Sequence, residues 1–159
     1  MSGEIFSAIC SYNRARFILQ ALDSLYAQDF DQEAFEVVVV DNNSTDNTLE
    51  LLATYKTQHP ARHFRYVTEP SQGVAYTRNR CAREAKGAII AYMDDDCIAQ
   101  PGWLKGIAEF FATHLDVYSV GGKIEPYFLT GIPDWYSKYF FGLVGRFDQG
   151  YNIKPLTGQ

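Results

Sequence analysis

Three consecutive carboxylates, Asp94, Asp95 and Asp96, follow an apolar run at residues 88–93. A run of this length, opened by Gly87, is typical of a strand that is buried on both faces of a parallel sheet. Because an unpaired charge in an apolar layer is costly, the three carboxylates must lie beyond the strand, at its carboxyl end. Ligands bind at this edge of open α/β sheets, and a divalent cation would relieve the repulsion between packed carboxylates. The triplet therefore predicts a metal-dependent ligand site, with a solvated acidic turn as the alternative.

A second apolar run also ends in an acid. Four valines at residues 37–40 are followed by Asp41 and then by a polar segment at residues 42–46. The polar segment is typical of the start of a helix, with Ser44 or Thr45 as the side-chain cap. Two buried strands that each end in a carboxylate predict one site built from both, with Asp41 and the aspartate triplet at neighbouring strand ends.

The composition limits the class of protein. The chain has 159 residues, of which 47% are hydrophobic, and this is enough for one domain with a core. The net charge is −5 and the 14 Lys and Arg residues are scattered, so no basic stripe favours a nucleic-acid partner. The apolar runs are much shorter than a transmembrane segment, and the first residues do not resemble a signal peptide.

The cysteines indicate the redox environment. Cys10, Cys81 and Cys97 are odd in number, widely spaced and without a C-x-x-C pair, so neither a disulfide framework nor a zinc site is expected. His59 and His63 are too few to hold a metal by themselves. We therefore expect a cytoplasmic protein, with peripheral attachment to a membrane as an alternative.

The rest of the chain alternates between two kinds of pattern. Strands are predicted at residues 5–10, 35–40, 64–68, 88–93 and 117–120. Helices are predicted around residues 18–25, 49–56, 75–85 and 101–111. Gly87 is expected to cap the third helix. Strands that alternate with helices of this length indicate a mostly parallel sheet with helices on both faces, in a single α/β domain over residues 1–159.

The segment at residues 123–159 differs from the rest because it is rich in aromatic residues, glycine and proline. Residues 134–141 could form a short helix with an aromatic face. The interpretation that we favour is that these rings pack over the sheet as part of the core. The alternative is a surface for an acceptor, a partner or a membrane interface.

Four motifs, in this order, resemble those of the family 2 glycosyltransferases, which have the Rossmann-like GT-A fold. The first is the turn C-S-Y-N-R at residues 10–14, where cysteine and serine replace the family's proline and threonine. The second is V-D-N-N-S-T-D at residues 40–46, which matches the family residue for residue. The third combines Q-G at 72–73, R-N at 78–79 and A-K-G at 85–87, and the last is M-D-D-D at 93–96. The resemblance extends from Ile5 to about Gly122.

The resemblance implies that a nucleotide diphospho-sugar binds at these motifs. Asp41 would accept a hydrogen bond from the base, and Tyr12 would offer its ring to that base. Arg78 would reach the base or the diphosphate, which suits a planar guanidinium, with a surface salt bridge to Glu84 as the alternative. The other nucleotide-sugar contacts would come from Ser11, Arg14, Asn43, Gly73, Asp94 and Asp95.

The aspartate triplet resembles the D-x-D motif of the family. Asp96 would bind Mg²⁺ or Mn²⁺, and Asp94 would contact the metal or the ribose. Diphosphate is a poor leaving group unless its developing charge is neutralised, and a bound divalent cation does this. Two carboxylates suffice, because phosphate oxygens commonly complete the coordination of Mg²⁺. The resemblance therefore implies an inverting, metal-dependent glycosyltransferase whose nucleotide-sugar donor carries uridine diphosphate.

The acceptor is left open between a sugar, a lipid-linked molecule and a protein, in the setting of cell-envelope polysaccharide biosynthesis. An inverting transfer also needs a base that deprotonates the acceptor. In the family this acid lies in a later block, and the acids after residue 120, namely Glu125, Asp134 and Asp148, match none of its motifs. We therefore expect the base beyond Gln159, and we expect the chain to be the truncated, donor-binding part of a longer enzyme, inactive in transfer by itself.

Other functions fit the pattern less completely. A non-catalytic module that binds sugar nucleotides would have the same donor site without the base. A nucleotidyltransferase also uses metal-bound acids on a nucleotide-binding sheet. A receiver-like phosphoacceptor domain or a phosphatase needs an acid directly after the first strand, where residues 11–14 supply none.

Overall fold

The computed structural model describes residues 5–140, 145–148 and 150. The chain divides into two compact units, at residues 1–115 and 116–159. The first unit contains the predicted alternation of strands and helices. That residues 1–159 form one domain stays a prediction.

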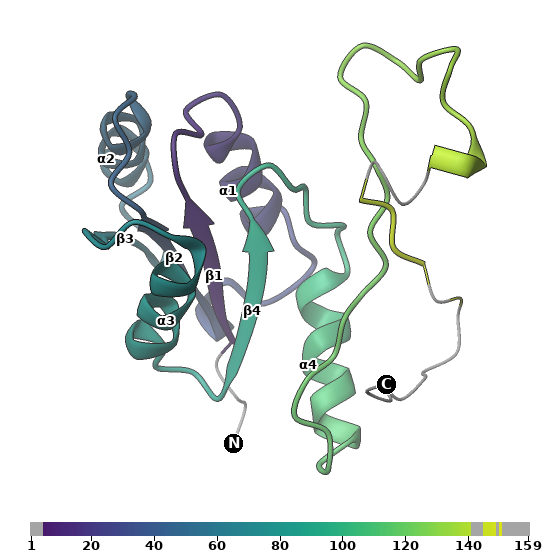
Figure 1. The fold of residues 1–159 in the computed structure, drawn as a ribbon. Helices are drawn as coiled ribbons and strands as arrows, with labels where there is room; N and C mark the ends of the chain where they lie inside the picture. The colour runs from purple at the N-terminus through teal and green to yellow at the C-terminus, as the bar shows by residue number, and fades with distance from the viewer. Residues whose placement is uncertain (1–4, 141–144, 149, 151–159) are drawn as a thin grey trace. The chain divides into compact units, whose positions relative to one another are not determined.

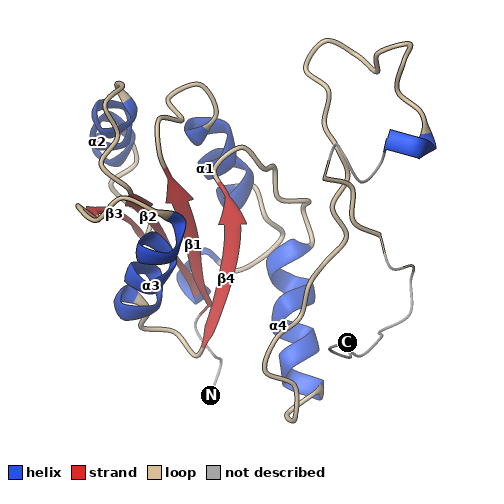
Figure 2. Cartoon of the chain, viewed as in Figure 1, coloured by secondary structure: helices blue, strands red, loops and turns tan. Residues whose placement is uncertain are grey.

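The first unit contains a parallel sheet of four strands. They are β1 (Ile5–Ser11), β2 (Phe35–Asp41), β3 (Phe64–Thr68) and β4 (Ile89–Asp94), and they lie in the order β3-β2-β1-β4 (Figure 1). The chain builds the sheet outward from β1 to β3 and then places β4 on the other side of β1. The arrows of β1 and β4 point the same way in Figure 2. Ligands bind outside the carboxyl ends of strands where the strand order reverses, and that point lies here between β1 and β4.

Helices cover both faces of this sheet, as predicted. α1 (Ile18–Tyr26), α2 (Thr48–Gln58) and α4 (Trp103–Thr113) bury side chains in the core on one face. α3 (Val74–Glu84) packs on the other face, in front of the sheet in Figure 1. Two short 3₁₀ helices lie at Gln32–Ala34 and Lys138–Phe140. None of the helices in the described part of the chain combines the length and the apolar composition that a membrane span requires.

Side chains along each strand alternate between the two cores. In β1, Ile5 and Ile9 belong to the core that faces α1, whereas Phe6 and Ala8 belong to the core that faces α3. The odd-numbered side chains of β1 and β2 therefore face α1, and the even-numbered ones face α3. This alternation decides which polar residues meet at the end of the sheet.

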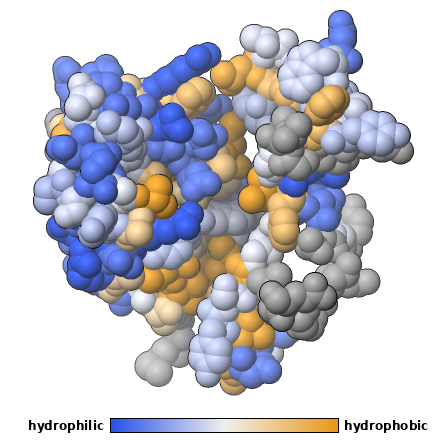
Figure 3. Space-filling view, in the orientation of Figure 1, coloured by the Kyte–Doolittle hydropathy of each residue, from blue (hydrophilic) through white to orange (hydrophobic). Residues whose placement is uncertain are grey.

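β4 differs from the prediction because only one of its faces is buried. It is an edge strand of the described sheet. Ala91 and Met93 are buried, whereas Tyr92 on the opposite face is 44% exposed. Apolar surface gathers along β4 in Figure 3, as expected for a strand with one neighbour and partial cover. The continuous apolar sequence indicates two buried faces, and this prediction is wrong because an edge position removes part of that cover.

The strand predicted at residues 117–120 is not formed. These residues belong to the second unit, and Tyr118 and Val120 are exposed. A run of four residues is too short to define a strand when no neighbouring strand pairs with it. Strand pairing in the described part of this unit is an antiparallel bridge between Ile124 and Phe147. The helix predicted at 134–141 is reduced to the 3₁₀ turn Lys138–Phe140, and residue 141 lies outside the described residues.

α3 ends earlier than predicted. Its last residue is Glu84, and the next residue is extended, so Gly87 does not cap the helix. Arg65 of β3 holds this end, because its Nη2 donates to the Glu84 carbonyl oxygen at 2.7 Å. The Nε of Arg65 also donates to Glu36 at 2.7 Å, and the Nε of Arg80 donates to the Glu84 carboxylate at 2.8 Å. A cation at a helix C-terminus satisfies carbonyl groups that have no partner within the helix.

We expect Glu84→Gln to destabilise the protein near neutral pH. Arg80 and Arg65 lower the pKa of Glu84, so the folded state favours the carboxylate and the stabilisation is present above a pH of about 4.5. The stabilisation is lost as the pH falls through the lowered pKa, because the carboxylate becomes protonated. The free energy of unfolding should therefore drop by about 1 kcal/mol at pH 7, and the difference should shrink as the pH falls from about 5 to about 3.

Chemical denaturation at several pH values measures this difference. Glu109→Gln on α4 is the matched control, because Glu109 is exposed and forms no ion pair within the described residues. A loss for Glu84→Gln that does not depend on pH would contradict the ionic role.

Candidate functional site

The carboxyl ends of β2, β1 and β4 lie side by side at one edge of the sheet. Ser11 of β1 is paired with Asp41 of β2, and Cys10 of β1 is paired with Asp94 of β4. The prediction that Asp41 and the aspartate triplet lie at neighbouring strand ends is therefore wrong, because β1 separates them. Two strand spacings place the ends of β2 and β4 about 10 Å apart. They still lie on one edge, at the point where the strand order reverses.

Asp95 links the end of β4 to the loop after β1. It is buried, and its Oδ2 accepts a hydrogen bond from the backbone N–H of Tyr12 at 3.4 Å. Its Oδ1 accepts from Arg14 Nε at 3.2 Å. Burial raises the pKa of Asp95, while the Arg14 guanidinium opposes that shift. Asp95 therefore has a structural role, and its contact with a nucleotide sugar stays a prediction.

The other two carboxylates of the triplet, Asp94 and Asp96, are exposed at the same edge. Asp96 Oδ2 lies 3.9 Å from Arg14 Nη2, so one guanidinium reaches both Asp95 and Asp96. This cation offsets part of the repulsion between the carboxylates. The neighbouring side chain of Tyr12 is 46% exposed, which leaves its ring open to a ligand.

Asn13 joins the loop after β1 to the loop after β2. Its φ of 54° lies in the left-handed region, which asparagine tolerates better than most residues. Its Oδ1 accepts from the backbone N–H groups of Thr45 at 2.8 Å and Asp46 at 3.3 Å, and its own N–H donates to Ser44 Oγ at 2.9 Å. Sequence reasoning gave Asn13 no role, although it stands between the predicted ligand residues Tyr12 and Arg14.

The cap of α2 also differs from the prediction. α2 begins at Thr48, and Asp46 Oδ1 accepts from its N–H at 3.0 Å. The hydroxyl of Ser44 instead accepts from Asn13, and the backbone N–H of Thr45 donates to Asn13. The predicted cap at Ser44 or Thr45 is therefore wrong, because both residues bind the neighbouring loop.

Asp41 ends β2 as a fully buried carboxylate. Its Oδ2 accepts from the backbone N–H of Ser44 at 3.0 Å, while Oδ1 has no hydrogen-bond partner among the described residues. An unpartnered buried acceptor costs about 1–3 kcal/mol, so Oδ1 favours a hydrogen-bond donor from outside this part of the chain. Asn43, two residues further, is exposed with a φ of 65°.

Asn42 joins the end of β2 to the loop after β3, and sequence reasoning did not find this role. It is buried, and its Nδ2 donates to the carbonyl oxygens of Glu69 at 3.0 Å and Ser71 at 2.7 Å. Its Oδ1 accepts from the Gly73 N–H at 2.7 Å. Gly73 has a φ of 135°, which other residues rarely adopt, so glycine is required where α3 begins. The close approach of Gly73 to a ligand stays a prediction.

Arg78 lies exposed on α3, and no carboxylate of the described residues is within ion-pair distance of it. Glu84 is engaged by Arg65 and Arg80 instead, so the alternative of a salt bridge between Arg78 and Glu84 is not formed. A hydrogen bond from Cys81 and, to a smaller extent, the positive charge of Arg78 lower the pKa of Cys10, at the carboxyl end of β1. The charge of Arg78 is therefore felt at the same edge of the sheet as the charges of the acids.

Cys10 and Cys81 meet between β1 and α3, with 3.7 Å between their sulfur atoms. A hydrogen bond from Cys81 is the largest effect that lowers the pKa of Cys10, and burial opposes it. The same contact and burial raise the pKa of Cys81, and burial raises that of Cys97. Cys10 is therefore the cysteine with the most thiolate character.

A divalent cation fits this edge together with ligand atoms from outside the described residues. The described residues contain no group of three or more His, Cys, Asp or Glu side chains that could hold a metal ion by themselves. Asp94 and Asp96 offer two exposed carboxylates, whereas Asp95 is engaged by Tyr12 and Arg14. Mg²⁺ is usually held by one or two carboxylates plus phosphate oxygens. The residues therefore fit a metal that binds together with a diphosphate.

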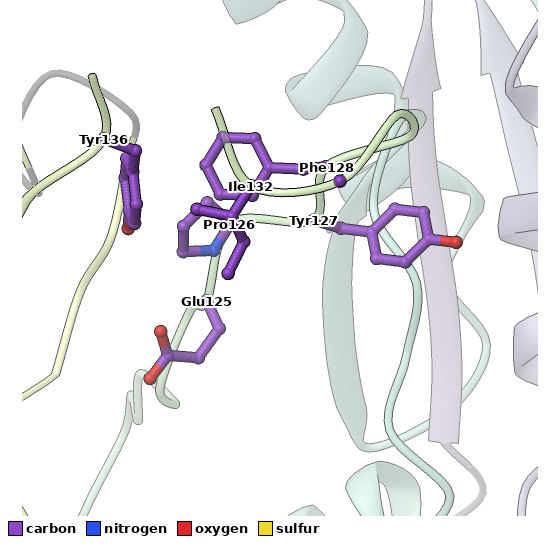
Figure 4. Close-up of a pocket in the computed structure, with 7 residues that line it drawn as sticks. Glu125, Pro126, Tyr127, Phe128, Ile132 and Tyr136 are labelled. Carbon is purple, nitrogen blue, oxygen red and sulfur yellow. The ribbon is translucent and has the colours of Figure 1, made fainter. Parts of the chain in front are cut away.

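The second unit contains a separate pocket that none of the predicted donor residues lines. It has a volume of about 360 Å³ and is lined by residues 125–128, 131, 132 and 136. Figure 4 shows Phe128 and Tyr136 on its walls, and their rings meet edge to face with 4.7 Å between centroids. Aromatic rings thus pack against one another within this unit. The two interpretations of the aromatic segment, core over the sheet and binding surface, stay predictions.

Two acids of the second unit, Glu125 and Asp148, lie in ion pairs. Lys123 and Arg146 contact both Glu125 and Asp148 at distances of 2.7 to 3.3 Å. Arg146 and Lys123 lower the pKa of Glu125 to about 2. A general base works best with a pKa near the working pH, so Glu125 is poorly suited to take a proton from an acceptor. That the base lies outside these acids stays a prediction.

The fold and this edge define the class of protein. The sequence profile of the family described as "Glycosyl transferase family 2" matches residues 8–155. The chain therefore belongs to glycosyltransferase family 2.

Individual relatives agree with this assignment. The chain is 32% identical over 115 residues to glycosyltransferase AglE of Haloferax volcanii, which covers 72% of this chain and 37% of that protein. The solved mannosyltransferase PcManGT from Pyrobaculum calidifontis, in complex with GDP-Man and Mn²⁺, has a TM-score of 0.66 and 30% identity over 69% of this chain and 32% of that chain. S. aureus TarS in complex with UDP has a TM-score of 0.64 and 28% identity over 78% of this chain and 38% of that chain. These neighbours confirm the GT-A fold, and the chain spans less than half the length of each.

We expect Cys10 to be alkylated several-fold faster than Cys81 or Cys97 near neutral pH. Its lowered pKa supplies more thiolate, which is the reactive form, and it is less buried than Cys81. Timed iodoacetamide labelling with mass spectrometry measures the three rates. Cys81→Ala should slow the labelling of Cys10, because the thiol that donates to it is lost, whereas Cys97→Ala should not. Labelling of Cys97 before Cys10 would contradict the assignment.

Proposed function

We propose that this chain forms the donor site of an inverting glycosyltransferase that takes a sugar from a uridine diphospho-sugar with the help of Mg²⁺ or Mn²⁺. The observation that carries the proposal is that two different kinds of carboxylate lie on opposite sides of β1. A buried carboxylate with an unpartnered oxygen, Asp41, lies on one side, and the exposed carboxylates Asp94 and Asp96 lie on the other. The buried carboxylate suits recognition of a nucleotide base, and the exposed carboxylates suit a metal-bound diphosphate.

The carboxylate of Asp41 is the group that we propose to recognise the nucleotide base. Its Oδ2 is already held by Ser44, which leaves Oδ1 as the acceptor for a donor on the base. Uracil offers one ring N–H on the edge that pairs with other bases, and this matches one remaining oxygen. Guanine would present two adjacent donors to the same group. Oδ1 is buried from solvent in the free chain, so the nucleotide base would reach it only after a small local movement. The exposed ring of Tyr12 would then cover the base.

The diphosphate is proposed to lie between the triplet and two cations. When bound, Mg²⁺ or Mn²⁺ would be held by Asp96 and Asp94 and would neutralise charge on the leaving diphosphate. Arg78, which has no carboxylate partner among the described residues, would approach the phosphates from α3. Arg14 would approach from the loop after β1, where Asp95 holds it in place. A guanidinium keeps its charge and offers a planar set of donors, which suits this task.

The transfer step needs an acceptor and a base, and both belong to the proposal for the whole enzyme. The match to AglE covers 37% of that protein, so the transfer activity of a whole enzyme is a proposal that extends beyond the compared residues. Among the described acids of the second unit, Glu125 and Asp148 are committed to Lys123 and Arg146. We therefore propose the donor site for this chain, and we do not propose Glu125 or Asp148 as the catalytic base.

Binding of UDP should depend on a divalent metal. Calorimetric titration with UDP in the presence of Mn²⁺, and again in EDTA, is expected to show affinity at least about tenfold weaker without metal, which corresponds to about 1.4 kcal/mol. Equal affinity in both conditions would remove the metal from the proposal. GDP in place of UDP separates the bases, and tighter binding of GDP would overturn the assignment to uridine while leaving the donor site intact.

Asp96→Ala should weaken UDP binding by at least about tenfold and should leave uridine binding unchanged, because the metal bridges to phosphate and not to the base. Asp29→Ala is the matched control, since Asp29 is exposed and lies outside the proposed site. If uridine and UDP lose affinity equally, the substitution has damaged the fold and Asp96 is not a metal ligand.

A further inference from the structure

Asn42 is a buried amide that spans the space between β2 and α3. It is 4% exposed and makes three hydrogen bonds to backbone groups of the loop after β3. Its own backbone N–H donates to the Ser11 carbonyl oxygen at 2.8 Å. Every polar atom of its side chain is thus used inside the protein, and none is left for a ligand. Its role is therefore indirect.

The groups that Asn42 holds are the start of α3. Its Oδ1 accepts from Gly73, whose carbonyl oxygen accepts in turn from the N–H of Thr77 at 3.2 Å and from the Thr77 hydroxyl at 3.1 Å. Gly73 is the residue before α3, and as a glycine it has no side chain that could cap the helix. The backbone position of the first turn therefore depends on the amide of Asn42. Arg78 stands one turn further along the same helix.

A second contact fixes the same loop to the same strand. The backbone N–H of Glu69 donates to the Asp41 carbonyl oxygen at 2.8 Å, and the Glu69 carboxylate accepts from the backbone N–H of Ser71 at 2.9 Å. Glu69 also lies 3.4 Å from Arg83 on α3. Hydrogen bonds therefore tie the loop after β3 to the end of β2, and the Asn42 side chain makes three of them.

We propose that Asn42 is a positioning residue that fixes the position of Arg78 relative to Asp41. Asn42 adjoins Asp41 in the chain and bonds to the turn from which α3 starts. It therefore connects Asp41, which is proposed to recognise the nucleotide base, to Arg78, which is proposed to bind the phosphates. Neither the base nor the diphosphate touches Asn42. The inference rests on the proposed function, because it uses the roles given there to Asp41 and Arg78.

A double-mutant cycle on UDP binding tests this connection. Asn42→Ala should weaken UDP binding by about tenfold, or about 1.4 kcal/mol, and uridine binding by less than about twofold. In the Arg78→Ala background the same substitution should change UDP binding by less than about twofold, because the group that Asn42 positions is already absent. An equal loss in both backgrounds would overturn the proposal, since a merely structural residue weakens binding whether or not Arg78 is present.

Gln28→Ala is the matched control. Gln28 is also a buried amide with two donated and one accepted hydrogen bond, to Ser24, Ala99 and Leu104. It should lower the melting temperature to a similar extent without showing coupling to Arg78. Coupling of the same size for Gln28→Ala would overturn the proposal.

Hydrogen exchange tests the turn without any nucleotide. Asn42→Ala should speed exchange at the Gly73 amide and in the first turn of α3, whereas Gln28→Ala should not. Unchanged protection of Gly73 would overturn the positioning role. A wild-type chain that binds neither UDP nor GDP would overturn the proposed function, and the exchange measurement would then decide separately whether Asn42 orders the start of α3.

Discussion

The edge of this sheet depends on hydrogen bonds between three polar side chains and the backbones of neighbouring loops. Asp95 connects the end of β4 to the loop after β1, Asn13 connects that loop to the one after β2, and Asn42 connects the end of β2 to the loop after β3. Loops without regular structure leave backbone N–H and C=O groups that need partners. Here carboxylate and amide groups supply those partners, and they do so between loops rather than within one. Four separate connections thus become one surface with fixed positions for the side chains it presents.

The same edge also contains polar groups that the protein leaves without internal partners. Asp41 Oδ1 is buried without a hydrogen bond, and Arg78 has no carboxylate partner, in the described part of a chain whose other charged groups frequently pair. Natural proteins violate the rules of polar satisfaction chiefly at functional sites. The unsatisfied acceptor lies on the β2 side of β1, and the exposed carboxylates Asp94 and Asp96 lie on the β4 side. This separation suits an elongated ligand with a base at one end and charge at the other.

Periodicity and turn chemistry were sufficient to predict four of the strands, the four helices, the parallel sheet and the gathering of acids at one edge. They were not sufficient for features that depend on partners distant in the sequence. Asn13 and Asn42 each bind a loop about thirty residues away, and no local pattern distinguishes such an amide from an ordinary turn residue. The cap of α2 was misassigned for the same reason, because Ser44 binds Asn13 instead of its own helix. Residues 117–120 have the composition of a strand, but composition does not provide a neighbouring strand. The continuous apolar run of β4 concealed its edge position, because sequence reports hydrophobicity and not the number of neighbours.

The alternation along β4 has a consequence for how this site can change during evolution. Ala91 and Met93 face the α1 core, and Asp95 continues that side, where it binds Tyr12 and Arg14; Asp94 lies on the other side, in register with Cys10. Insertion or deletion of a single residue within the strand would exchange the two sides, because strand side chains repeat every second position. The carboxylate that anchors the neighbouring loop would then point toward α3, and its neighbour would point toward the core. A single substitution in β4 therefore leaves this alternation unchanged, whereas a change in the length of the strand would move both acids to the opposite faces. The number of residues in the strand, as well as its composition, thus decides which aspartate is buried against the neighbouring loop and which is exposed.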